Sequence, residues 1–109
     1  MSRLIVSPSL IPAEPLRKRA PAFDEHGNAL SDFMVLFPGL IKKPQHLIQD
    51  TIKNIQAVFA KYEHAVVFAE LNLKLSLLWI SVRPIPGMRF EIIHALRTLI
   101  PEAKLVSHI

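Results

Sequence analysis

Two arginines flank a short segment containing proline and glycine, Arg83-Pro-Ile-Pro-Gly-Met-Arg89, which directly precedes a predicted helix. The first turn of a helix exposes backbone N–H groups and the positive end of the helix dipole, and both favour anions. Gly87 allows a ligand to approach the backbone closely. The repeated glycines of a phosphate-binding loop are missing, so the alternative is a proline-stiffened connection with solvated arginines. We expect Arg83, Gly87 and Arg89 to form the binding site if the chain takes a small anionic ligand.

The other residues that could bind a metal or take part in catalysis form no recognisable motif. The five histidines show no pair at the spacing of metal ligands, so the sequence predicts neither a metal site nor a cofactor. The absence of cysteine excludes disulfides, thiol catalysis and thiolate metal sites. There is no serine-nucleophile motif and no paired-carboxylate motif. No catalytic residue is predicted, and whether the chain is an enzyme stays open.

A row of polar residues interrupts the longest apolar region of the chain, residues 65–82. Glu70, Asn72, Lys74 and Ser76 recur at a spacing of two, which is typical of strands. We interpret them as the exposed ends of two strands, at an edge protected by charge. The alternative is that Glu70 and Lys74 form an acid–base pair in a pocket. Because charge at the centre of a membrane span is costly, we expect no membrane association.

The first 30 residues differ from the rest of the chain. Four of the nine prolines lie there, and proline fixes φ and removes a hydrogen-bond donor, so neither a helix nor a central strand is expected. Apolar residues such as Leu4 and Phe23 argue against a free linker. Residues 1–30 are therefore predicted to form an extended arm, packed on its own sheet or a partner's, with a turn at Asp24-Glu-His-Gly-Asn28. The prolines also interrupt any secretory signal, so we expect a cytoplasmic protein.

Residues 31–109 are predicted to form one folded domain. Ile48, Ile55 and Phe59 fall on one side of a helix over residues 44–62, and a second helix is predicted over residues 88–99. The predicted strands cover residues 32–37, 64–71, 75–83 and 103–108. This βαββαβ order is that of the ferredoxin-like α+β fold, an antiparallel sheet with two helices on one face.

The two predicted central strands are apolar on both sides. Phe33 and Met34 point to opposite faces of the first strand, and Trp79 and Ile80 do so on the third. A strand with two apolar faces has both faces covered, and helices cover only one face of this fold. We therefore expect a homodimer that buries the second face. The predicted dimer interface consists of Phe33, Val35, Phe37, Leu77 and Trp79.

Three classes of function are consistent with these features. The favoured one is a small binding or regulatory module that self-associates through an apolar sheet face and takes an anionic small molecule. The second is a small enzyme of the dimeric ferredoxin-like barrel type. The third is a nucleic-acid binder that uses Arg17-Lys18-Arg19 and the strand aromatics, as RNA-recognition modules do. The third is disfavoured, because a run of three basic residues is short and residues 75–82 lack the glycine-containing RNA-recognition signature.

Overall fold

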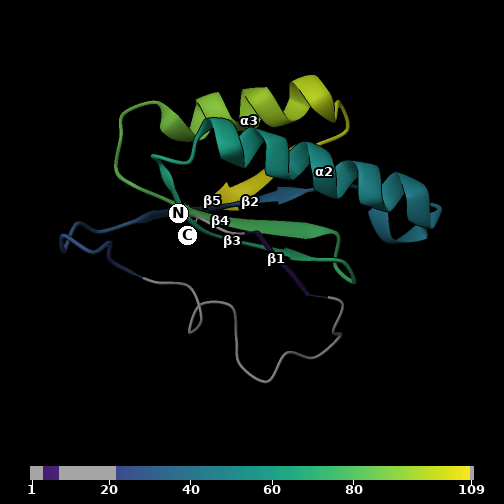
Figure 1. The fold of residues 1–109 in the computed structure, drawn as a ribbon, viewed down its shortest axis with the longest axis horizontal. Coiled ribbons are helices and arrows are strands. Elements are labelled where there is room, and N and C mark those ends of the chain that lie inside the picture. Colours follow the sequence, from purple (N-terminus) through teal and green to yellow (C-terminus); the bar gives the residue numbers. More distant parts are fainter. Residues whose placement is uncertain (1–3, 8–21, 109) are drawn as a thin grey trace.

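A computed structural model gives the fold of residues 4–7 and 22–108. Two helices lie on one face of a five-stranded sheet, in which the strand order is β1-β3-β4-β2-β5 (Figure 1). The strands are β1 (Leu4–Ser7), β2 (Ser31–Leu36), β3 (Val66–Asn72), β4 (Leu77–Val82) and β5 (Lys104–His108). The helices are α2 (Gln45–Lys61), α3 (Met88–Leu99) and the short 3₁₀ helix η1 (Leu40–Lys42).

The predicted ferredoxin-like α+β fold is confirmed. Strands β2 to β5 pair antiparallel in the order β5-β2-β4-β3, and α2 and α3 form the two crossovers. The two strands expected at the centre, β2 and β4, lie there. One strand was not predicted: β1 pairs parallel with β3, with Leu4 opposite Ala69, and extends the sheet at that edge. The remainder of the predicted arm between residues 8 and 21, including Arg17-Lys18-Arg19, lies outside the described residues.

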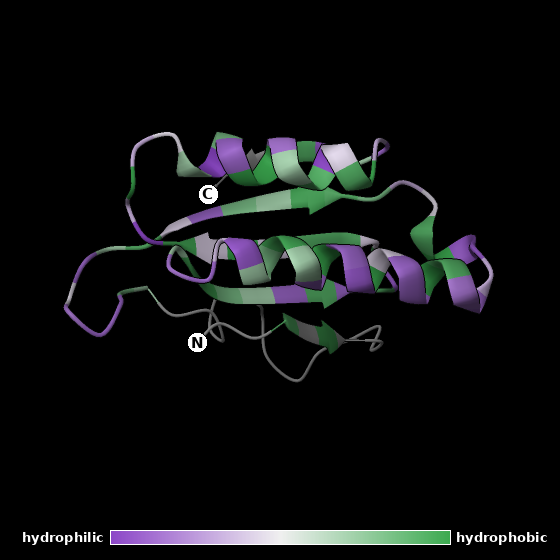
Figure 2. Cartoon of the chain, turned by 45° about the horizontal axis from the view of Figure 1, so that its top comes forward, coloured by the Kyte–Doolittle hydropathy of each residue, from purple (hydrophilic) through white to green (hydrophobic). Residues whose placement is uncertain are grey.

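The helices form where the sequence pattern places an apolar stripe (Figure 2). In α2, Ile48, Ile55 and Phe59 are buried, as their spacing predicts. Pro44 occupies the N-cap position of α2, just before the first helical residue. Gly87 precedes α3 with φ of 77°, a left-handed conformation that glycine adopts without steric cost. None of the described helices is both long enough and apolar enough to cross a membrane.

The main core lies between the sheet and the two helices. Phe33 and Val35 of β2 are opposite Ile80 and Leu78 of β4, and all four side chains are fully buried. Burial of an apolar side chain of this size contributes about 1.5–3 kcal/mol, so this layer is a major source of stability. On the opposite, helix-free face, the same register places Met34 beside Trp79.

Candidate functional site

The loop between β4 and α3 brings the three residues predicted to bind an anion into one pocket. Arg83, Gly87 and Arg89 all line a hollow of about 300 Å³. Its remaining walls are largely apolar and include Ile85, Met88 and Phe90. The prolines at positions 84 and 86 restrict φ on this loop, and no side chain caps the first turn of α3. The three residues named from the sequence therefore line the same hollow, which is formed almost entirely by this one continuous stretch of the chain.

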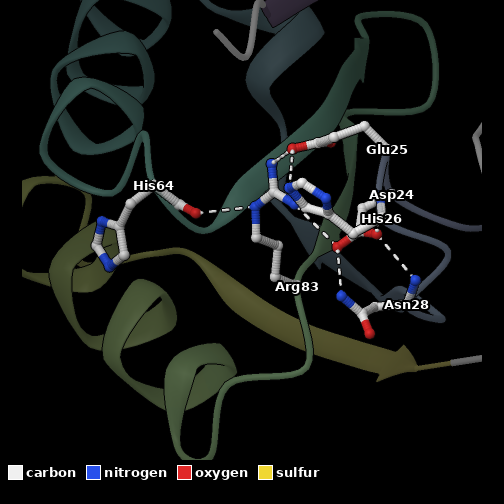
Figure 3. A network of polar contacts seen from close by, with 6 residues as sticks. All are labelled: Asp24, Glu25, His26, Asn28, His64 and Arg83. Carbon is white, nitrogen blue, oxygen red and sulfur yellow. Dashed lines mark hydrogen bonds and ion pairs between the residues drawn. The ribbon is translucent and has the colours of Figure 1, made fainter.

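The Arg83 guanidinium is held by groups of the chain itself (Figure 3). Its Nη1 donates to Asp24 Oδ2 at 2.9 Å and its Nη2 donates to Glu25 Oε1 at 2.9 Å. Its Nε donates to the backbone oxygen of His64 at 3.0 Å. The three contacts connect the residue that follows β4, the turn after α2 and the segment before β2. We call this set of contacts the Arg83 clasp.

The acidic partners of Arg83 come from a small hairpin formed by residues 22–30. Asp24 Oδ1 accepts from the backbone N–H groups of His26 at 2.9 Å and of Asn28 at 2.8 Å. The side chain of Asp24 is only 2% exposed. Gly27 adopts φ of 83°, which closes the turn that the sequence predicted at residues 24–28. The turn therefore presents a carboxylate in a fixed position to Arg83.

The contacts of the clasp lower the pKa values of its two carboxyl groups and raise the pKa of its guanidinium, as expected for ion pairs. Burial alone raises the pKa of Asp24, but hydrogen bonds from Asn28 and His26, together with the charge of Arg83, lower it to about 2. The pKa of Glu25 is lowered by its own backbone N–H and by the hydrogen bond from Arg83. The hydrogen bond to Glu25 in turn raises the pKa of Arg83.

The surroundings of Arg83 are consequently unfavourable for an external anion. One guanidinium faces two carboxylates, and Glu25 lies at the surface with His26 Nε2 at 3.7 Å from its Oε1. These groups line a second hollow, of about 440 Å³, on the hairpin side of the loop. Sequence reasoning missed Asp24 and Glu25 as the partners of Arg83. Their acidic side chains and turn signature were visible, but nothing in the sequence linked them to a position 59 residues away.

Arg89 has a different environment. Among the described residues no carboxylate lies within ion-pair distance of its guanidinium, and Cζ lies 5.9 Å from the centroid of the Phe90 ring. The side chain is half-buried and also lines a hollow of about 90 Å³ beside β5. Within the described ranges, Arg89 is therefore the arginine of this loop that has no carboxylate partner.

The residues predicted to form one dimer interface lie on opposite faces of the sheet. Phe33, Val35 and Phe37 belong to the core beneath the helices and are at most 1% exposed, so they are not available to a partner. Leu77 and Trp79 lie on the helix-free face. The prediction combined two faces because the sequence does not fix how β2 and β4 are aligned.

The helix-free face is itself largely shielded from water at its centre. Trp79 is 6% exposed and Glu70, its neighbour across β3 and β4, is 2% exposed. Ser81 donates to Asp32 Oδ1 at 2.7 Å on the same face. The indole Nε1 of Trp79 is buried and has no hydrogen-bond partner in the described part of the chain. Met34 is half-buried beside it. The helix-covered face of the central strands is thus removed from solvent, whereas the helix-free face is buried at Trp79 and only partly buried at Met34.

Residues 4–7 and 22–108 contain no group of three or more histidine or acidic side chains arranged to hold a metal ion. No protein-family model matches the chain, and no curated protein or solved structure is significantly similar to it.

Proposed function

We propose that the chain is a small binding module for an anionic organic ligand, which occupies the pocket of the 83–90 loop. The main support is the convergence of Arg83, Gly87 and Arg89 on one hollow of about 300 Å³ with apolar walls. Small-molecule sites are typically of this size or larger, mainly apolar, and contain a few polar groups that fix orientation. The composition of this pocket fits that description.

The two arginines have separate roles in this proposal. Arg89 pairs with the anionic group of the ligand, because no carboxylate of the described residues forms an ion pair with it. Arg83 positions the loop through the clasp and does not contact the ligand directly. Ile85, Met88 and Phe90 contact an apolar body attached to the anion. The expected ligand class is therefore a branched or aromatic carboxylate rather than inorganic phosphate.

A thermal-shift screen of aliphatic and aromatic carboxylates tests this proposal. A ligand present at ten times its Kd stabilises the folded state by about 1.4 kcal/mol, which corresponds to several degrees in Tm for a domain of this size. We expect Arg89→Gln to abolish the shift. Arg97→Gln, also on α3 but outside the pocket lining, is the matched control and should retain it. Absence of a shift with any carboxylate, or an equal loss in both variants, contradicts the proposal.

Self-association through the helix-free face remains part of the proposal, with the interface moved to Met34, Leu36, Leu77 and Trp79. The observation in its favour is that Met34, Leu36 and Leu77 are only partly buried within the chain. Sedimentation equilibrium should give a dimer for the native chain and a monomer for Leu77→Glu. Leu75→Glu, at an exposed turn position, is the control and should remain dimeric. A native chain that stays monomeric at all accessible concentrations contradicts self-association.

A further inference from the structure

The outer edge of β5 combines exposed backbone with exposed apolar side chains. In the described part of the chain β5 is the last strand of the sheet and pairs only with β2, on one side. Its free edge therefore presents N–H and C=O groups that another extended segment can pair with. Leu105 and Val106 of β5 are 38% and 48% exposed, and Phe90 at the start of α3 is 66% exposed. We call Phe90, Leu105, Val106 and the free backbone edge the β5 edge surface.

A small hollow lies next to this edge, between the strand and the helix. It has a volume of about 90 Å³ and is lined by Phe33, Arg89, Phe90, Ile93 and Leu105. That volume suits one aliphatic side chain, and the lining is apolar apart from Arg89. An extended segment paired with β5 would direct alternate side chains toward the helix side of the sheet, where the hollow lies.

The charge around the β5 edge surface has one sign. Arg89, Arg97 and Lys104 flank it, and none of them forms an ion pair with a described residue. Arg97 lies close to β5, because its Nε donates to the backbone oxygen of Ala103 at 3.0 Å. As far as the described residues go, the three cations therefore leave a positive charge along the edge that no carboxylate pairs with.

The neighbouring carboxylates do not neutralise this charge. Glu102 pairs with Lys43, with 2.6 Å between Nζ and Oε2. Glu91, Ala95 and Thr98 follow one another at steps of four and three, so they lie on the same side of α3. Ala95 and Thr98 line a hollow shared with α2, so Glu91 lies on the side of α3 that is turned away from β5. The region is therefore complementary to an acidic partner.

We propose that the β5 edge docks an acidic, extended segment of a partner protein. Its backbone pairs with β5, one apolar side chain enters the hollow beside Leu105, and flanking carboxylates face Arg89 and Lys104. Strand addition of this kind obtains affinity from main-chain hydrogen bonds and specificity from alternate side chains. The pocket of the 83–90 loop shares Arg89 and Phe90 with this surface, but Lys104 and the β5 backbone do not line that pocket, so Lys104→Glu and β5 amide exchange test strand docking separately from small-ligand binding.

A second copy of the chain is a poorer fit to the same edge. Antiparallel pairing of two β5 strands about Val106 places Lys104 opposite His108 of the other copy, so no opposite charges meet. The register of β5 against β2 also shifts between Met34 and Val35, an irregularity that limits long edge-to-edge pairing. A short acidic segment avoids both obstacles.

Selection from a display library of random linear peptides tests this proposal without knowledge of the natural partner. Peptides selected on the native chain should be enriched in Asp and Glu around a Val, Ile or Leu, and synthetic copies should bind with a strong salt dependence. Lys104→Glu should weaken their binding by roughly tenfold, and Phe90→Asp should weaken it as well. Lys53→Glu is the matched control, since Lys53 is exposed on α2, and it should bind like the native chain. Amide hydrogen exchange in β5 should slow when the peptide is bound.

Several outcomes would overturn the proposal. They are the absence of acidic enrichment, an equal loss of binding in Lys53→Glu, and unchanged exchange of the β5 amides in the complex. Protection of those amides in a peptide-free dimer would assign the edge to a second copy. Oligonucleotide binding that Lys104→Glu abolishes, without peptide binding, would assign it to nucleic acid. Because Lys104 is exposed, its variant should fold normally, and because Lys104 does not line the pocket of the 83–90 loop, the carboxylate screen on Lys104→Glu separates a failure of strand docking from a failure of small-ligand binding.

Discussion

Arg83 and Arg89 flank the same loop, yet their electrostatic environments are opposite. Arg83 donates to Asp24, to Glu25 and to the backbone oxygen of His64. Arg89 has no ionic partner among the described residues and lies against the ring of Phe90. Arg83 connects the hairpin of residues 22–30 to the sheet, whereas Arg89 lines a pocket without a carboxylate partner from the described residues.

The difference shows that a cation close to a helix N-terminus is not by itself an anion site. What decides is whether the chain supplies its own carboxylates to that cation. The hairpin of residues 22–30 reaches Arg83 and satisfies it, and it supplies no acidic partner to Arg89. The two positions therefore predict different consequences of mutation: loss of stability at Arg83 and loss of binding at Arg89.

The largest expected effect on stability follows Arg83→Ala. The substitution removes three hydrogen bonds and leaves the buried carboxylate of Asp24 without its cation, which is costly in a poorly solvated position. We expect Tm to fall further than for any other single substitution in this loop. Arg83→Lys should recover only part of the loss, because an ammonium group cannot reproduce the forked geometry. Equal Tm values for the native chain and Arg83→Ala would contradict a stabilising clasp.

The next effect is a loss of stability in acid. The folded-state pKa of Asp24, about 2, lies below its ordinary value, so the carboxylate stabilises the fold above about pH 4. This contribution is lost as the pH falls toward 2, and the lowered pKa of Glu25 adds to the loss in the same direction. Thermal unfolding across this range should show a declining Tm. In Asp24→Asn the decline should be smaller, and an unchanged slope would argue against a lowered pKa.

Gly87→Ala should have a smaller effect, about 1 kcal/mol, because an L-residue at positive φ is strained. No atom lies within 4 Å of the position that the new Cβ would occupy, so the cost comes from the backbone alone. Gly39→Ala is the matched control, with φ of 73° and equally open space. Both variants should lose similar stability in urea unfolding, but only Gly87→Ala should alter carboxylate binding.

The smallest effect on stability is expected for Arg89→Ala. The side chain makes no ion pair with a described residue, so the free energy of unfolding should change by no more than about 0.5 kcal/mol. Urea unfolding of this variant beside Arg83→Ala measures the contrast directly. A larger loss for Arg89→Ala than for Arg83→Ala would reverse the assignment of the two residues.

The sequence predicted the fold well, because the apolar spacing of the helices and the apolar pattern of the strands are both local signals. The apolar spacing of Ile48, Ile55 and Phe59 predicted α2, and the second helix was predicted with its observed bounds. Strand β1 was missed, because its pairing with β3 depends on residues more than 60 positions away and the surrounding prolines favoured an irregular arm.

The candidate site was predictable only in part, since it depends on long-range contacts. The local pattern of residues 83–89 named three residues that line one hollow. It could not show that Asp24 and Glu25 neutralise Arg83. The sequence pattern also could not fix the register that places Phe33 opposite Ile80 and Met34 opposite Trp79. A shift of one residue in this register exchanges the two faces of a strand.

The most direct test compares the two arginine side chains in one sample by NMR of their Nε–H groups. We predict slow solvent exchange for Arg83, whose Nε–H is bonded to the oxygen of His64, and rapid exchange for Arg89. Addition of the best carboxylate from the screen should shift the Arg89 signal and leave the Arg83 signal in place. Rapid exchange at Arg83, or a ligand-induced shift at Arg83 alone, would contradict the division between a clasp and a free binding cation.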